Sequence, residues 1–138
     1  MSNADALLGH WRLVDAKLEF SDNGEVTQLF GPHPQGVLAF LPGRRMMAIL
    51  TDTDRKTGDS SAKLLAGMLA YSGRYTVEGD SFATDVDISW HPSWLGSHQV
   101  RYFEVEGEEL RIISAVQTRP AFPDRPARAT LVWRREPA

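Results

Sequence analysis

The sequence contains no cysteine among its 138 residues. A disulfide framework, a thiolate nucleophile and a cysteine metal site are therefore excluded. It also lacks an apolar run of about 20 residues, the length that a helix needs to cross a membrane. Because the first residues carry neither a basic segment nor an apolar core, we expect no secretory signal and no membrane partner, and a cytoplasmic location.

A strong excess of charge of one sign is also missing. The net charge of −3 gives no reason to expect nucleic acid or an anionic membrane as a partner. Without an internal repeat or a linker-like stretch, residues 1–138 are predicted to form a single domain. A chain of this length buries roughly two-thirds of the surface that its unfolded form exposes.

What the sequence does contain is a series of short strand patterns separated by tight turns, such as Asp22-Asn23-Gly24. About nine strands are predicted in this way. The first, over His10–Phe20, changes the face of its apolar residues near Asp15, which predicts a bulge there. An antiparallel meander of this length removes its edges by closing on itself. We therefore predict an all-β fold, a closed antiparallel up-and-down β-barrel of roughly eight to ten strands with room inside for one small ligand.

One helix interrupts the strands. The segment Ala62–Tyr71 has an apolar stripe at helical spacing, and Ser60 or Ser61 can cap its first turn. We expect this helix to pack at one end of the barrel or on its outside. The segment Arg119–Arg128 contains three prolines and is predicted to be a loop.

The most informative pattern runs over residues 81–106 and predicts a β-hairpin. Side chains alternate between two faces of a strand, and residues 91–97 contain the proline and glycine of a turn. A symmetrical hairpin sets Asp85 opposite Glu104, which two acids tolerate only in water. The other face is therefore predicted to be the inner one, and it carries Phe82, Thr84, Val86, Ile88 and Trp90, then Gln99, Arg101, Phe103 and Val105.

Arg101 is the leading candidate for a functional residue. The symmetrical register sets it opposite Ile88, within an apolar wall, with Gln99 opposite Trp90 and one step nearer the turn. A buried charge is costly unless it has a partner. That partner is either an internal acid, such as Asp15, or an anionic group of a ligand that Arg101 and Gln99 bind.

Four aromatic residues are further candidates for ligand contact. Tyr71 and Tyr75 share one face and either line the same cavity or belong to the core with their hydroxyl groups bonded. Trp90 and Trp94 flank the turn of the hairpin. They either form a lid at the barrel mouth or pack on the neighbouring strand.

No metal or cofactor site is predicted. His91 and His98 bracket the turn and are predicted to face each other on the outer surface, but a metal would need at least one more ligand. Asp85 and Asp87 form a pair of carboxylates of the kind that glycosidases use. Because the predicted pairing places both on the outer face, solvated acids are the favoured interpretation.

Several segments together resemble the bacterial and fungal lipocalin-like domain family. Gly9-His10-Trp11 is similar to the G-x-W signature of lipocalins, and Arg134 or Arg135 resembles the arginine that stacks over that tryptophan. The resemblance covers nearly the whole chain and implies a calycin-type barrel whose floor is held by Gly9, Trp11 and Arg134. The other matching segments are Leu8–Val14, Phe30-Gly31-Pro32 with Pro34 and Gly36, Arg45-Met46, Tyr71–Tyr75 and Trp90–Arg101.

Three functions are compatible with these patterns. The first is binding of a small, mostly hydrophobic or amphipathic molecule whose polar or anionic group meets Arg101 and Gln99. The second is a cofactor-independent isomerase, cyclase or lyase, in which Arg101 stabilises an oxyanion and Tyr71 or Tyr75 transfers a proton. Many members of the resembled family carry a histidine where this chain has Thr84, which weakens this alternative. The third is a filled barrel, a monomer or a homodimer, that acts through its surface.

Overall fold

The computed structural model describes residues 3–119 and 122–137. Ten strands in these residues form one sheet in which every pairing is antiparallel. The elements are α1 (Asn3–Leu7), β1 (Gly9–Phe20), β2 (Val26–Gln28), β3 (Gln35–Leu41), β4 (Arg45–Thr51), α2 (Ser61–Ala66), β5 (Met68–Glu78), β6 (Ser81–Ser89), the 3-10 helix η1 (Pro92–Trp94), β7 (His98–Glu106), β8 (Glu109–Ser114), β9 (Gln117–Arg119) and β10 (Phe122–Arg135).

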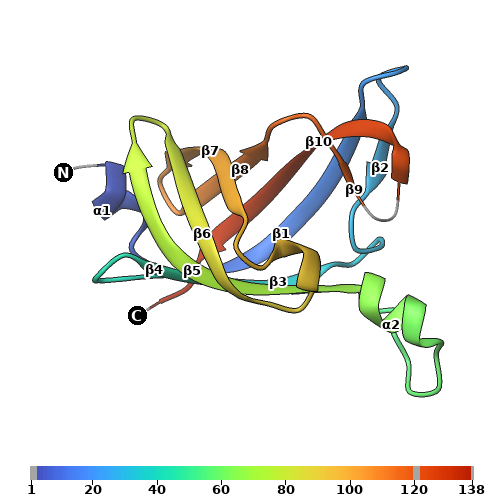
Figure 1. Ribbon diagram of the computed structural model, residues 1–138. Coiled ribbons are helices and arrows are strands. Elements are labelled where there is room, and N and C mark those ends of the chain that lie inside the picture. The colour runs from blue at the N-terminus through green and yellow to red at the C-terminus, as the bar shows by residue number, and fades with distance from the viewer. Residues whose placement is uncertain (1–2, 120–121, 138) are drawn as a thin grey trace.

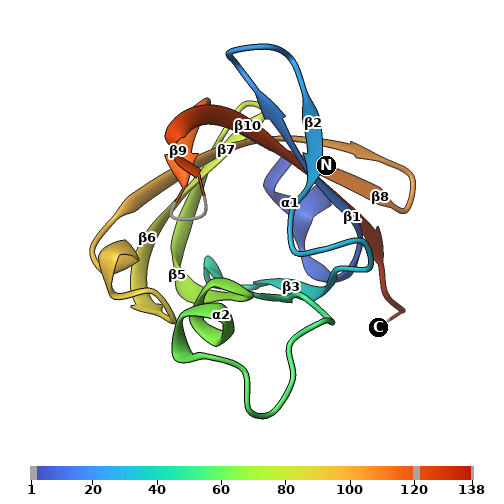
Figure 2. The same ribbon diagram turned by 90° about the vertical axis from the view of Figure 1, so that its right-hand side faces the viewer.

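The sheet closes because β1 pairs with β10. Eight strands form the ring in the order β1-β3-β4-β5-β6-β7-β8-β10, while β2 and β9 extend the sheet from β1 and β10. Figure 1 shows the barrel from the side, with α1 at one end and α2 toward the other, and Figure 2 shows the ring of strands from the end that carries α2 and β9. The predicted closed antiparallel barrel is confirmed.

The floor of the barrel is built on Trp11, which is fully buried. Its indole N–H donates a hydrogen bond of 3.0 Å to the carbonyl of Leu7 at the end of α1. The guanidinium of Arg135 lies 4.1 Å from the centre of the Trp11 ring and donates to the carbonyls of Leu8 and Ala6. These contacts join both ends of the chain across the bottom of the barrel.

Of the two arginines that the resemblance offered for this position, Arg135 lies over Trp11, and the choice of Arg134 as the floor residue is corrected. In the β1–β10 ladder Trp11 stands opposite Arg135, whereas Arg134 stands opposite Arg12 and faces outward. The backbone of Gly9 has φ +119, and a Cβ atom there would come within 3.0 Å of the Arg135 side chain. Glycine at this position therefore makes room for the arginine.

The bulge predicted near Asp15 is present. The register between β1 and β10 shifts between Leu13 and Asp15. The extra residue changes which side chains face the interior. Leu13 before the shift and Ala16, Leu18 and Phe20 after it are consequently all buried.

The helix predicted over Ala62–Tyr71 is shorter in the structure. α2 ends at Ala66, and its cap is the expected Ser60, whose Oγ accepts a hydrogen bond of 3.2 Å from the Lys63 N–H. The segment Met68–Tyr71 pairs instead with β4, starting where Thr51 stands opposite Met68. A complete backbone ladder with a neighbouring strand outweighs the helical spacing of a few leucines.

The loop predicted over Arg119–Arg128 is also corrected. β10 begins at Phe122, and the short strand β9 ends at Arg119. Pro123 and Pro126 fall where the register between β9 and β10 shifts, between Phe122 and Ala127. Prolines are tolerated there because no regular ladder requires their missing N–H groups.

The central hairpin is formed by β6 and β7, but its register differs from the symmetrical one. Arg101 stands opposite Phe82 rather than Ile88. The displacement is an even number of positions, so Arg101 keeps its predicted inner face. A second irregularity, between β5 and β6 at Gly73 and Val86, turns Ile88 outward, where it is 66% exposed.

Candidate ligand cavity

Two neighbouring cavities share part of their lining. The inner cavity has a volume of about 50 Å³, and the mouth cavity has a volume of about 290 Å³. The two cavities are therefore described as one site. Five residues line both of them: Leu29, Phe30, Leu69, Trp94 and Arg119. The mouth lies at the end nearest α2 and β9, which Figure 2 faces, and α1 lies at the far end.

Arg101 is placed on the inner wall by β7. Arg101 is 8% exposed and lines the inner cavity. Nη1 donates to the carbonyl of Val100 at 2.9 Å, and Nη2 donates to Oε1 of Gln99 at 3.0 Å. The guanidinium carbon also lies 5.9 Å from the centre of the Trp94 ring, so the side chain is held by β7 and by η1.

Gln99 supports Arg101 and lines neither cavity. Besides accepting from Arg101, it donates through Nε2 to Ser97 Oγ at 2.8 Å. Ser97 Oγ in turn donates to the carbonyl of Trp94 at 2.6 Å. This hydrogen-bonded chain connects η1 to the guanidinium and fixes the position of both.

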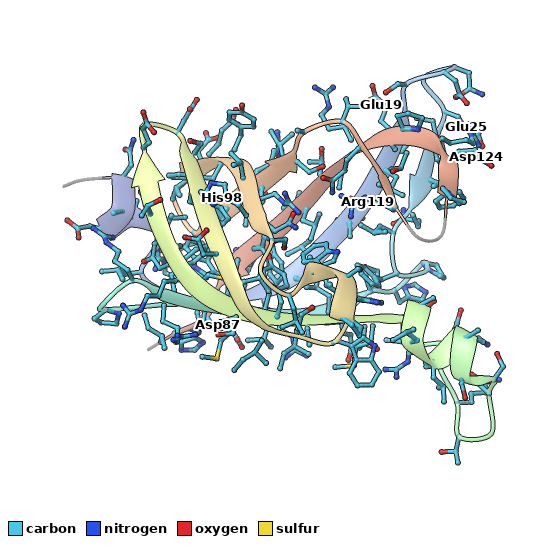
Figure 3. The ribbon with its side chains drawn as sticks, in the orientation of Figure 1. Glu19, Glu25, Asp87, His98, Arg119 and Asp124 are labelled. Atoms are coloured by element: carbon cyan, nitrogen blue, oxygen red, sulfur yellow. The ribbon has the colours of Figure 1, made fainter. Side chains whose placement is uncertain are left out.

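Arg119, which the sequence reasoning assigned to a loop, is the second arginine of the site. It lines both cavities, and its Nη2 donates to Ser114 Oγ at 3.4 Å. Its Nε is buried and has no hydrogen-bond partner among the residues that the structure describes. Figure 3 shows Arg119 within the outline of the barrel, while Glu19, Glu25 and Asp124 lie at the periphery. Because β9 has only three residues, it is too short to show the alternation that would have revealed an inward side chain.

Neither Arg101 nor Arg119 forms an ion pair with any residue that the structure describes. Asp15, the internal acid suggested as a partner, lies 3.5 Å from Lys17 instead. Burial lowers the pKa of Arg101, and burial together with the nearby charge of Arg101 lowers the pKa of Arg119 to about 10. The inner cavity is therefore lined by two guanidinium groups and by no acidic side chain of the described residues.

Tyr71 lines the inner cavity with the two arginines. Its ring lies 5.1 Å from the ring of Trp94, centre to centre. Burial raises the pKa of its hydroxyl, and the charges of Arg101 and Arg119 oppose that rise. The hydroxyl is therefore neutral at physiological pH and is able to donate a hydrogen bond.

The structure does not support ligand contact by Tyr75 or Trp90. Tyr75 is 1% exposed, lines neither cavity and packs edge to face on Phe40, with the ring centres 5.1 Å apart. Trp90 is 42% exposed and donates through its indole N–H to the carbonyl of Leu65 at 3.1 Å. Trp90 was predicted to lie on the inner face. It lies on the outside because β6 turns outward after its irregularity.

The histidines and paired acids lie in separate surroundings. His91 lines the mouth, with Nε2 2.9 Å from the carbonyl oxygen of Met68. His98 Nδ1 lies 2.7 Å from Asp85 on the outer face, and Asp87 pairs with Arg45 at 2.8 Å. Over residues 3–119 and 122–137, no three such side chains gather as potential metal ligands.

A protein-family model described as a lipocalin-like domain matches residues 8–136. The match covers nearly the whole chain and agrees with the barrel and its floor. No curated protein matches the sequence. Within the described part of the chain, no helix has the length and apolar character needed to cross a membrane.

Proposed function

We propose that this chain, which belongs to the lipocalin-like domain family, binds a small, mostly hydrophobic molecule that carries an anionic group. The observation that supports this proposal is the pair of Arg101 and Arg119 in one cavity, without a carboxylate partner among the described residues. A buried charge without a partner is costly, and a ligand anion supplies the partner that the protein lacks.

The hydrophobic part of the proposed ligand follows from the walls of the mouth. Most of the lining residues are apolar, among them Leu18, Leu29, Phe30, Leu69 and Phe122. Apolar surface removed from water there contributes about 25 cal/mol per Å². The volume of the mouth is near the lower end of the range for small-molecule sites, which favours a compact or slender ligand.

Binding is favoured over catalysis by the state of Tyr71. The alternative function as a cofactor-independent isomerase, cyclase or lyase needs a group that removes a proton as well as an oxyanion partner. A tyrosine whose pKa is raised by burial donates a hydrogen bond but does not serve as a base near neutral pH. The inner cavity combines donors and cations, which suits recognition of an anion.

Calorimetric titration with three molecules that share one tail tests the proposal. Decyl sulfate is anionic, decanol is neutral and decyltrimethylammonium is cationic, and each is used below the concentration at which it forms micelles. We expect decyl sulfate to bind most tightly. Arg101→Met, which keeps an apolar stem and removes the charge, is expected to weaken that binding by about 2–5 kcal/mol.

The matched control is Arg111→Met, which removes an exposed arginine from the outer face of β8. Decyl sulfate is expected to bind this variant as it binds the unmodified protein. Equal binding of decanol and decyl sulfate, or an unchanged affinity in Arg101→Met, would show that the cavity does not recognise an anion.

A further inference from the structure

The inner cavity contains two positive charges, and their number restricts the ligand. Arg101 and Arg119 both line it, and no acid among the described residues pairs with either. Building on the proposed function, we infer that the anionic group of the ligand is doubly charged, as in a phosphate monoester or a compact dicarboxylate.

Charge balance is the first argument. A monoanion bound between the arginines would neutralise one guanidinium and leave the other buried without a counterion. Burying an ion costs several kcal/mol unless a partner compensates. A dianion neutralises both. It also relieves the repulsion from Arg101, which adds to the effect of burial in lowering the pKa of Arg119.

The remaining polar groups of the inner cavity are the second argument. The Nε of Arg119 and the indole N–H of Trp133 are buried donors without hydrogen-bond partners in the described part of the chain, and both residues line this cavity. The neutral hydroxyl of Tyr71 adds a third donor. The oxygen of Gln99 is already occupied by Arg101. A cluster of donors requires a ligand with several acceptor atoms, and a phosphate group has three strong ones.

The charges at the mouth do not compete for the anion. Asp52 and Lys63 both line the mouth cavity and have opposite signs. Lys63 is engaged with Asp59 at 3.4 Å, and the carboxylate of Asp52 would repel an anion. The doubly charged group is therefore expected at the inner end, and the apolar part of the ligand in the mouth.

Two molecules of the same shape separate charge from size. Decyl phosphate and decyl sulfate have the same tail and a tetrahedral head, but the phosphate gains its second charge with a pKa of about 6. At about pH 8 we expect decyl phosphate to bind about tenfold more tightly or better, the range of an added charged hydrogen bond. At about pH 5, where both heads carry one charge, the two affinities are expected to converge.

Decyl sulfate, measured at both pH values, is the control for changes in the protein. Because the charge of the sulfate does not change over this range, any change in its affinity comes from the protein and not from the ligand. Decylmalonate against dodecanoate makes the same comparison for carboxylates, because the two molecules differ by one carboxylate. The affinities of the two doubly charged molecules, decyl phosphate and decylmalonate, are then compared. The one that binds more tightly shows whether the site prefers a phosphate or a dicarboxylate.

Removing one cation tests the role of charge directly. In Arg119→Met the preference for decyl phosphate over decyl sulfate is expected to disappear, while Arg111→Met keeps it. Equal affinities of the unmodified protein for both molecules at about pH 8, with the same result for decylmalonate and dodecanoate, would overturn the inference and leave the proposed function standing. If none of these anions binds more tightly than decanol, both the inference and the proposed function are wrong.

Discussion

Arg101 and Arg119 reach the same inner cavity from different strands, β7 and β9, which are separated in the sheet by β8 and β10. Two like charges in an apolar interior destabilise the empty protein. The two arginines therefore have opposite effects on stability and on ligand affinity. The predictions below separate these effects from the contributions of the barrel itself.

The ligand-free protein is expected to become more stable when Arg119 is replaced by Met. Burial, with a smaller contribution from the charge of Arg101, lowers the pKa of Arg119 to about 10. A basic group with a lowered pKa reduces stability at every pH below about 10, and the penalty is lost as the pH rises above about 10 toward the higher pKa of the unfolded chain. We expect the free energy of unfolding at neutral pH to rise by about 1–3 kcal/mol, measured by urea denaturation.

Arg128→Met is the control for this change, because Arg128 is exposed on β10 and lies 3.8 Å from Glu19. Its effect is expected to stay within about 0.5 kcal/mol. A loss of stability in Arg119→Met larger than in this control would contradict the assignment of an uncompensated charge.

Gln99→Leu is expected to weaken anion binding without removing a charge. Gln99 holds Nη2 of Arg101 at 3.0 Å and connects it to Ser97. Loss of a hydrogen bond to a charged group costs about 1.5–3 kcal/mol, so decyl sulfate should bind less tightly than to the unmodified protein but more tightly than to Arg101→Met. An affinity equal to that of the unmodified protein would show that Arg101 needs no such support.

Trp11→Ala is expected to reduce stability by about 3–5 kcal/mol, the usual cost of removing a buried large aromatic side chain. Trp11 is fully buried at the floor and lines neither cavity. Ligand affinity, measured by calorimetry at a temperature where the variant is folded, should change much less. Loss of binding with unchanged stability would show that the site lies at the floor of the barrel and that its assignment to the mouth is wrong.

Gly73→Ala is expected to destabilise the barrel although it adds a single methyl group. A Cβ atom at Gly73 would collide with the backbone oxygen of Asp85 on β6, at the irregularity between the two strands. Overpacking of this kind costs about 1–3 kcal/mol or more. Thr76→Ala, an exposed position on the same strand, serves as the control in thermal melts.

The sequence alone predicted the features that depend on local patterns. The alternation around Asp15 predicted the bulge in β1, and the serine before α2 predicted its cap. The period of two along β7 placed Arg101 inside, although its partner is Phe82 rather than Ile88. When the register shifts by an even number of residues, each side chain stays on the same face of its strand. The inner position of Arg101 could therefore be predicted without the correct pairing.

Tertiary structure decided what local patterns leave open. Met68–Tyr71 became a strand because β4 offers it a full ladder, and Trp90 moved to the surface because β6 has an irregularity that no local signal marks. Arg119 lies in the same cavity as Arg101 because β9 pairs with β10 and the pairing of β10 with β1 closes the barrel around that cavity. Closure is a long-range event that depends on pairing between strands far apart in the chain, so the sequence predicted one buried arginine and the fold supplied the second.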